Sequence, residues 1–422
     1  MATNTGTERI TTQCCIVGAG PAGMMAGFLL ARSGVDVVVL EKHPDFLRDF
    51  RGDTIHPSTL EVMRELGLLD SFLRRPHQEI RQIGAQVGKF SVTLGDFSHL
   101  PTACKFIALM PQWDFLNFLA ESGRQFAGFH VCMETEATDL IEEGTRTGGA
   151  RATAPTGSLE VRANLVIAAD GRRSILREKA GLEVEVLGAP IDVLWMRISR
   201  KESDPAQTGG RIDRGSFFVT LNRGDYWQCA FVIPKGGIDE VRAKGIEHFR
   251  QLIVEIAPHF ADRVHELKDW DDVKLLSVAV DRLRQWYRDG LLCIGDAAHA
   301  MSPVGGIGIN LAIQDAVAAA NILAPAFAHG GIPIELLESV QERRMFPTRA
   351  TQWLQIQIQN RVLSPALRNR APIRSLPLVV KVVDRWPVLR RIPARIVGIG
   401  FRPEHVKTPV IEQRPAGAMA RT

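Results

Sequence analysis

Apolar residues near the N-terminus fall into short blocks separated by glycines and one acid. Residues 14–17 are apolar, the turn 18–23 reads G-x-G-x-x-G, and residues 24–32 place apolar side chains at helical spacing. A Ser-Gly pair then interrupts the helical pattern, and a second apolar run over 35–40 ends at Glu41. The pattern predicts a strand, a glycine turn, a helix and a second strand closed by an acid.

This order of elements is typical of a site for an adenine dinucleotide. Gly18, Gly20 and Gly23 let the backbone and a helix N-terminus approach a pyrophosphate, where amide N–H groups favour negative charge. Glu41 follows Gly23 by 18 residues and is placed to bind a ribose 2′-hydroxyl, which argues against a 2′-phosphate in this site. No second G-x-G-x-x-G in such a frame occurs, so separate flavin and nicotinamide domains are not expected.

Two later strand–turn–helix units follow the same logic. Residues 163–169 predict a buried strand that ends at Asp170-Gly171, before a short helix over 175–180. A plain β-turn with an Asp helix cap is the alternative for this unit. Residues 290–294 lead into Gly295-Asp296, and a glycine-rich turn at 305–308 opens a helix over 309–323. A dinucleotide held at both ends indicates FAD more than a nicotinamide cofactor.

The middle of the chain predicts β-strands at 191–199, 215–221 and 226–234, separated by Gly, Asn and Asp turns. Its aromatic residues each have ordinary core packing as an alternative. Together, on one face of a sheet, they would line an apolar pocket for an aromatic or lipid-like molecule. They are Trp195, Phe217, Phe218, Tyr226, Trp227 and Phe231.

Composition narrows the class of protein. The 422 residues are 45% apolar, enough for two or three domains with large cores. The six cysteines show no metal-ligand spacing, so we expect reduced structural thiols and no metal site. No run reaches the roughly 18 apolar residues of a spanning helix, and a cytoplasmic protein is expected.

Charge is distributed unevenly along the chain. From Arg361 to the end there are 13 Lys and Arg against 3 Asp and Glu, a net charge of +10, while the rest carries 38 against 44. A basic tail wrapped on the protein is one interpretation. Peripheral contact with an anionic membrane is the other, and nucleic acid is not expected because no aromatic-interleaved basic patch accompanies the charge.

The three ordered motifs resemble those of the p-hydroxybenzoate hydroxylase-type (group A) FAD-dependent monooxygenases, over roughly residues 10–365. The resemblance implies an α/β fold: a glutathione-reductase-type Rossmann FAD-binding domain, an inserted antiparallel β-sheet substrate domain and a helical C-terminal segment. It places the FAD-binding domain at 8–75, 101–185 and 275–365. The substrate domain is expected at 76–100 and 186–274, and a basic helical or loop tail at 366–422.

The resemblance also implies roles for individual residues. The expected FAD contacts are Gly18, Gly20, Ala22, Gly23, Glu41, Lys42, Arg51, Gln112, Asp170, Asp296, Gly306, Gly308, Ile309 and Asn310. Arg51 also resembles the basic residue of a mobile loop beside the flavin, Pro303 would line the oxygen-reaction face, and Tyr226 is a candidate for a proton relay. Arg173 is a weaker candidate for a nicotinamide pyrophosphate.

Two histidines lie near these motifs. His56 is interpreted as a helix cap, with acid–base chemistry as the alternative, and His299 as a packed, hydrogen-bonded structural residue.

The implied activity is NAD(P)H- and O2-dependent hydroxylation of an aromatic, phenolic or quinol-like small molecule through a flavin C4a-hydroperoxide. The reductant is NADPH or NADH, and the substrate is aromatic or lipophilic. Epoxidising or ring-opening oxygenation of a polyketide or isoprenoid substrate remains open, as does an FAD-dependent isoprenoid-type reductase. From another class, a flavin-binding protein without catalysis would bind FAD yet show no substrate-stimulated reductant use. Oligomeric state is not predicted.

Overall fold

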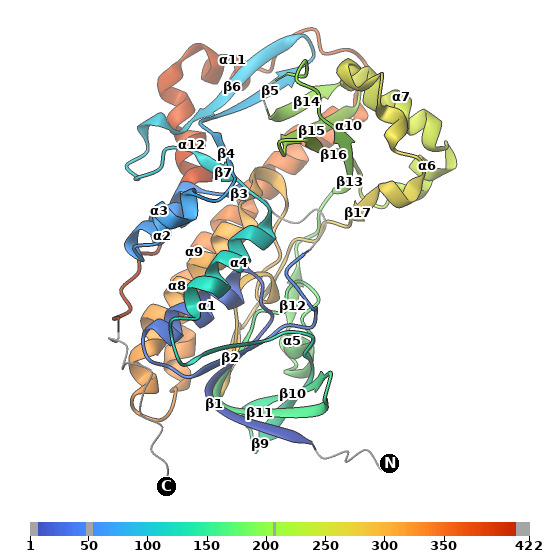
Figure 1. Cartoon of the computed structure of the whole chain (residues 1–422). Helices are drawn as coiled ribbons and strands as arrows, with labels where there is room; N and C mark the ends of the chain where they lie inside the picture. The colour runs from blue at the N-terminus through green and yellow to red at the C-terminus, as the bar shows by residue number, and fades with distance from the viewer. Residues whose placement is uncertain (1–6, 48–53, 206–207, 411–422) are drawn as a thin grey trace.

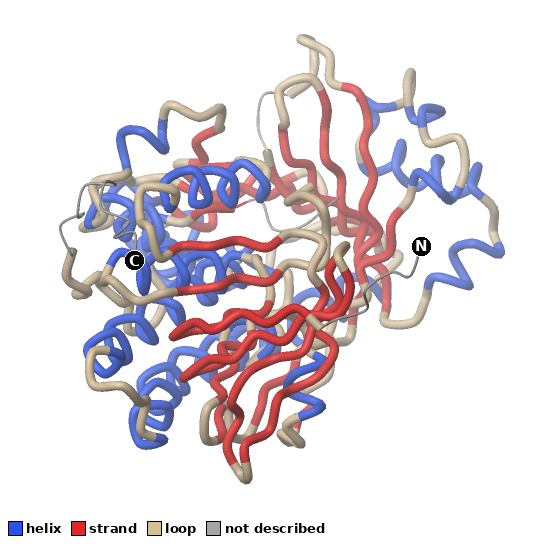
Figure 2. The backbone as a smooth tube through the Cα atoms, turned by 60° about the horizontal axis from the view of Figure 1, so that its bottom comes forward, coloured by secondary structure: helices blue, strands red, loops and turns tan. Residues whose placement is uncertain are grey.

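The computed structural model describes residues 7–47, 54–205 and 208–410, and its strands gather into separate sheets with helices packed around them (Figures 1 and 2). The α-helices are α1 (Pro21–Arg32), α2 (Pro57–Glu65), α3 (Leu69–Leu73), α4 (Gln112–Gly123), α5 (Ile175–Lys179), α6 (Ile238–Ala243), α7 (Ile246–Ile256), α8 (Gly308–Phe327), α9 (Ile334–Ile358), α10 (Ser364–Arg368), α11 (Leu378–Arg385) and α12 (Arg391–Gly398). The strands are β1 (Glu8–Val17), β2 (Val37–Leu40), β3 (Thr54–Ile55), β4 (Gln78–Ile80), β5 (Gln82–Val87), β6 (Phe90–Asp96), β7 (Ile107–Leu109), β8 (Phe129–Cys132), β9 (Glu136–Glu143), β10 (Arg146–Ala154), β11 (Gly157–Ala168), β12 (Val184–Val186), β13 (Ile191–Ser199), β14 (Gly209–Asp213), β15 (Ser216–Asn222), β16 (Tyr226–Pro234), β17 (Lys274–Leu276), β18 (Asp281–Leu283), β19 (Tyr287–Arg288) and β20 (Leu291–Cys293).

A parallel sheet carries the three predicted motifs. Its strands run in the order β20-β11-β1-β2-β8, each pair parallel, with β19 added antiparallel to β20 and β9 and β10 extending from β11. Three of these strands end directly before a motif, so the motifs meet at one edge of the sheet. Helix α1 packs on β1 and β2, with α4 and α8 beside it and α9 on α8 (Figure 1). The predicted α/β fold is confirmed.

The second large sheet has the order β17-β13-β16-β15-β14-β5-β6, so it draws on two separate stretches of chain. Alternation of side chains gives this sheet two faces. Phe218, Trp227 and Phe231 lie on one face, in an apolar cluster with α7. Trp195 and Phe217 lie on the other face, in a cluster that includes Val304 beside the third motif. The expectation of one aromatic face is therefore wrong, because neighbouring residues of a strand point to opposite sides. The domain boundaries given above stay a prediction.

The end of the described chain is built into the FAD-binding side of the molecule. Residues 402–409, which we call the C-terminal strap, cross α2, α8 and α1 in turn. The Val406 N–H donates to Glu65 of α2 at 2.7 Å, and Lys407 donates its N–H to Asn321 of α8 at 2.8 Å. Arg32, at the end of α1, donates to the carbonyl of Thr408 at 2.7 Å. This part of the predicted tail is therefore a structural element of the core.

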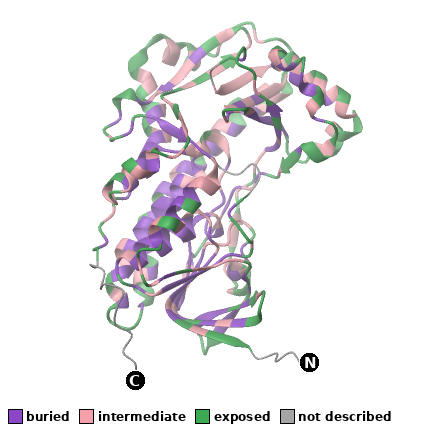
Figure 3. Cartoon of the chain, in the orientation of Figure 1, coloured by how far each residue is buried: buried purple, intermediate pink, exposed green. Residues whose placement is uncertain are grey.

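Burial concentrates in the parallel strands and in α1 and α8, as Figure 3 shows. The segment Val304–Phe327 is long and apolar enough to cross a membrane by length and composition, contrary to the sequence expectation, but 78% of its most apolar window is buried inside the protein. Its hydropathy is therefore that of a core helix. All six cysteines are free thiols, and five of them are buried.

Candidate active site

The first glycine turn is shaped by close backbone contacts. Gly18 has a φ of +100°, and a Cβ there would lie 2.4 Å from the carbonyl oxygen of Ala169. A Cβ on Gly23 would lie 1.9 Å from the oxygen of Gly18. Gly20, the N-cap of α1, differs because a Cβ there would meet no atom within 4 Å. The turn thus leaves open space at a helix N-terminus, which fits the pyrophosphate of FAD.

Glu41 lies against this turn at the end of β2. Its carboxylate accepts hydrogen bonds from the N–H of Ala19 at 3.0 Å and of His43 at 3.2 Å, and the residue is almost fully buried. The acid is therefore fixed beside the glycine turn, in the place where a ribose is expected. Lys42, the next residue, is exposed.

Asp170 follows β11 and lies beside Gly18. Its Oδ2 accepts a hydrogen bond from the N–H of Ile175 at 2.9 Å and so caps α5, as the turn-and-cap interpretation predicts. Its Oδ1 is buried and accepts no hydrogen bond in the described ranges. Burial raises the pKa of Asp170, although hydrogen bonds from Ser174 and the α5 amides oppose the rise. A buried acceptor without a donor fits a ligand that donates a hydrogen bond to it. Arg173 is exposed.

The third motif approaches the first through small residues. Gly295 has a φ of +60°, and a Cβ there would lie 3.0 Å from the methyl of Ala22 on α1 and 3.2 Å from that of Ala312 on α8. Asp296 follows Gly295 in a half-buried turn. The two motifs that would hold the ends of a dinucleotide therefore meet across α1 and α8.

The glycine turn before α8 is held by an asparagine side chain. Asn310 accepts hydrogen bonds at Oδ1 from the N–H of His56 and the hydroxyl of Thr59, both at 2.8 Å, and it donates to the carbonyl of Gly306 at 3.3 Å. Thr54 donates to the same carbonyl at 2.9 Å. Sequence reasoning expected backbone contacts from Asn310 and did not foresee this side-chain role.

The first turn of α8 presents backbone donors. The N–H groups of Gly308, Ile309 and Asn310 have no acceptor among the residues with described positions, whereas Leu311 donates to Ile307 at 3.0 Å. Such free N–H groups at a helix N-terminus stabilise nearby negative charge. Thr54 pairs with Leu109 of β7, and Gln112 opens α4 three residues later, so Gln112 lies in the same region.

The loop that carries Pro303 is held by three buried glutamines on one side of α9 and its continuation. Gln352 donates to the carbonyl of Ala300 at 3.1 Å. Gln355 accepts from the N–H of Ser302 at 3.1 Å and donates to the carbonyls of Ser302 at 3.0 Å and Val304 at 2.9 Å. Gln359, in a π-helical turn, donates to the Ser302 hydroxyl. These glutamines recur at helical spacing in a stretch without charged residues, which indicates a buried polar helix face. Sequence reasoning missed this signal.

A fully buried ionic network lies behind the third motif. Asp315 of α8 contacts His299 at 2.6 Å and Arg344 of α9 at 2.8 Å, and Arg344 also reaches Glu404 of the C-terminal strap at 3.4 Å. Burial would raise the pKa of Asp315, but the charges of His299 and Arg344 hold it below its usual value. His299 is therefore a packed, hydrogen-bonded structural residue, as predicted.

His56 occupies the N-cap position of α2, but its side chain does not cap the helix. Nδ1 donates to the carbonyl of Val397 on α12 at 2.7 Å, since a carbonyl can only accept. Burial lowers the pKa of His56 to about 4, opposed by the bond to Val397. The capping interpretation is right about position and wrong about the side chain.

One predicted catalytic residue, Tyr226, lies away from this group. Tyr226 begins β16, roughly 20 Å along the strand from Val232, which packs in the cluster with Val304. Its ring lies under Arg197, with the guanidinium 5.0 Å from the ring centroid. Arg51 lies outside the described residues, and its role stays a prediction.

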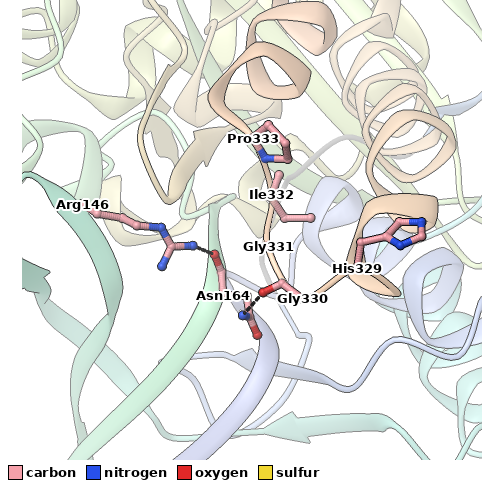
Figure 4. A pocket seen from close by; sticks show the side chains of 7 residues that line it. All are labelled: Arg146, Asn164, His329, Gly330, Gly331, Ile332 and Pro333. Carbon is pink, nitrogen blue, oxygen red and sulfur yellow. Dashed lines mark hydrogen bonds between the residues drawn. The ribbon is translucent and has the colours of Figure 1, made fainter.

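A surface pocket of about 420 Å³ lies apart from all these residues (Figure 4). Asn164 of β11 donates to the carbonyl of Gly330 at 3.0 Å, and Arg146 donates to the backbone of Asn164. Gly330 belongs to the loop between α8 and α9. The pocket is an open depression at this loop and holds none of the motif residues.

A dinucleotide-binding parallel sheet, an open glycine turn, and a second helix N-terminus facing an apolar sheet together define a flavoprotein of the monooxygenase type. Comparison with known proteins supports this class. The family model described as FAD binding domain matches residues 11–354, and the chain belongs to this family of FAD-dependent monooxygenases. The 6-methylpretetramide 4-monooxygenase of Streptomyces rimosus is 32% identical over 392 residues, which cover 91% of this chain and 92% of the relative.

Solved structures share the fold. The anhydrotetracycline hydroxylase OxyS from Streptomyces rimosus superposes with a TM-score of 0.73 at 21% identity, covering 92% of this chain and 76% of that one. The p-nitrophenol 4-monooxygenase PnpA from Pseudomonas putida DLL-E4 gives a TM-score of 0.75 at 20% identity, covering 92% and 97%.

Proposed function

We propose that this FAD-dependent monooxygenase uses NADH or NADPH with O2 to hydroxylate a fused-ring aromatic substrate, bound between the second sheet and the turn at Pro303. Support for a fused-ring substrate comes from the 6-methylpretetramide and anhydrotetracycline named for two similar proteins.

The observation that carries the proposal is the apolar face opposite the N-terminus of α8. Val193 and Trp195 of β13 and Phe217 and Val219 of β15 belong to one cluster, and Val304 packs against it. This face is apolar, while the turn below it presents backbone donors. A flat apolar molecule with a few polar groups suits such a site.

The chain's own groups would then act by position and charge. FAD supplies electron transfer and oxygen activation when bound. The free N–H groups at the start of α8 stabilise negative charge at the edge of the ring system. Asp170 offers to a donor on the cofactor its Oδ1, which has no partner within the described residues, and the glutamines of α9 hold the loop that carries Pro303.

The reductant is expected at the surface, because no second dinucleotide unit exists in the sequence. Exposed Arg173, three residues after Asp170, is our candidate for the nicotinamide pyrophosphate. Arg173→Ala should raise the KM for NADH or NADPH and leave the affinity for FAD unchanged. Arg124→Ala is the matched control, because Arg124 is exposed and lies at the opposite end of α4 from Gln112.

The test of the activity measures NADH and NADPH oxidation in air by the FAD-loaded protein, with and without a panel of fused-ring phenols and simple phenols. Stimulation by one compound, with one labelled oxygen atom from ¹⁸O2 in its product, is the expected result. Reductant use that no compound changes, with only hydrogen peroxide formed, would overturn it. Product without label from O2 would favour the reductase alternative.

A further inference from the structure

The C-terminal helices before the strap lie on the outside of the second sheet. Helices α11 and α12 pack against β6, at the top of the view in Figure 1. Their inner sides are well anchored. Asp384 accepts a hydrogen bond from the N–H of Thr93 on β6 at 3.1 Å, and Ala394 is fully buried in a cluster with Phe97 and Leu100.

The outer side of the same helices exposes large apolar residues. Each keeps between 58% and 76% of its surface accessible, although such side chains usually avoid solvent when they are grouped. We call this set the outer C-terminal surface. Its apolar members are Leu378, Val379, Trp386, Val388 and Ile392.

Within residues 371–395, the exposed charged side chains are all cationic. Residues 371–395 contain six Lys and Arg and one acid, Asp384. That acid is turned inward, where it binds Thr93 and pairs with Arg390 at 3.4 Å. The exposed cations that remain are Arg374, Lys381, Arg385, Arg391 and Arg395.

We propose that the outer C-terminal surface docks on an anionic membrane. Apolar side chains on helices that lie flat against a protein can enter the boundary between headgroups and acyl chains, while neighbouring cations bind lipid phosphates. Trp386 sits among these cations, and tryptophan favours this interface. An anionic membrane would bind both the exposed apolar side chains and the cations of this surface. Nucleic acid would bind the cations but leave the apolar side chains in water.

The proposal does not depend on the enzyme's substrate. The docking residues are separate from the glycine turns and from the Pro303 loop, so activity in solution and membrane binding can be measured independently. Deletion is a poor test, because the strap that follows α12 is built into the core. Point substitutions on the outer side avoid this problem.

The experiment uses FAD-loaded full-length protein and flotation with vesicles of phosphatidylcholine alone or with 30% phosphatidylserine, taken as roughly the anionic content of a cytoplasmic leaflet. We expect binding to the anionic vesicles that weakens as salt is added. The double variant Lys381→Gln/Arg385→Gln should bind about 30-fold more weakly, at about fivefold per cation. Trp386→Ser should weaken binding to both kinds of vesicle.

Lys268→Gln/Lys274→Gln is the matched control, since it removes two exposed lysines elsewhere and should bind like the wild type. Thermal melting and retained FAD confirm that each variant is folded. No binding to anionic vesicles at low salt would overturn the proposal, as would equal losses in the two double variants. A dimer in solution that Trp386→Ser dissolves, without vesicle binding, would instead assign this surface to a second copy of the chain.

Discussion

His56 predicts a defined loss of stability in mild acid. The imidazole is fully buried, and its pKa is lowered from 6.5 to about 4 by burial. The unfolded chain therefore takes up a proton near pH 6.5, while the folded chain does so only near pH 4. Stability from this group is complete above pH 6.5 and is lost as the pH falls towards 4. At about 1.4 kcal/mol for each pKa unit, the full loss is about 3 kcal/mol, of which about 2 kcal/mol has gone by pH 5.

The assay is urea unfolding, followed by tryptophan fluorescence, at pH 7.5 and pH 5.0. His56→Asn keeps an N–H that can donate to Val397 but cannot titrate, so this variant should lose about 2 kcal/mol less than the wild type between the two pH values. Exposed His265→Asn is the control and should behave as the wild type. Equal losses in the wild type and His56→Asn would refute the reasoning, because the buried imidazole would then contribute nothing to the acid response.

Three further predictions concern groups around the cofactor site. Gly18→Ala forces a left-handed residue and a backbone clash, and should weaken FAD binding about tenfold or more, measured by fluorescence titration of apoprotein. Arg344→Met removes the fully buried cation that lies between the carboxylates of Asp315 and Glu404, and it should lower the free energy of unfolding by about 3–5 kcal/mol. Arg343→Met removes the half-exposed partner of Glu404 and should cost less than about 1 kcal/mol. Gln355→Leu breaks the hydrogen bonds that hold the Pro303 loop, so it should lower the free energy of unfolding by about 2 kcal/mol. It should also lower the amount of product formed per reductant consumed. Gln357→Leu, at a half-exposed position, should change neither quantity. An unchanged product ratio in Gln355→Leu would show that the loop keeps its place without this side chain.

Local patterns predicted the motif-bearing elements well. Helix α1 begins in the predicted glycine turn and ends at Arg32, and β13 and β16 match their predicted ranges. Glycine turns, caps and alternating runs are set by residues close in sequence, so they can be read from it. The predicted strand at 14–17 was too short, because residues 8–12, which are polar except for Ile10, also join β1 through parallel pairing with β11.

Contacts between distant residues could not be read in this way. The glutamines on α9 hold a loop about 50 residues earlier, and Asn310 ties together segments more than 250 residues apart. Asp315 did indicate one such contact. It is the one charged residue in the apolar helix over 308–327, and a buried charge needs a partner. The sequence did not say that the partners would be His299 and Arg344. The placement of Phe217 and Phe218, by contrast, could have been predicted from the sequence. Adjacent residues of a strand face opposite sides of the sheet, so the two rings cannot share one face.

The C-terminal strap also determines when the cofactor half of the protein can complete its folding during synthesis. Arg32 and Thr408 are 376 residues apart, yet they are hydrogen-bonded across the end of α1. At about 5–20 residues per second, a ribosome needs roughly 20 to 75 s to add the intervening chain. Glu65 and Asn321 also accept hydrogen bonds from the strap, at Val406 and Lys407. The cofactor half of the enzyme therefore cannot complete these contacts until residues 402–409 have been made, and its unfinished surface stays exposed to aggregation until then.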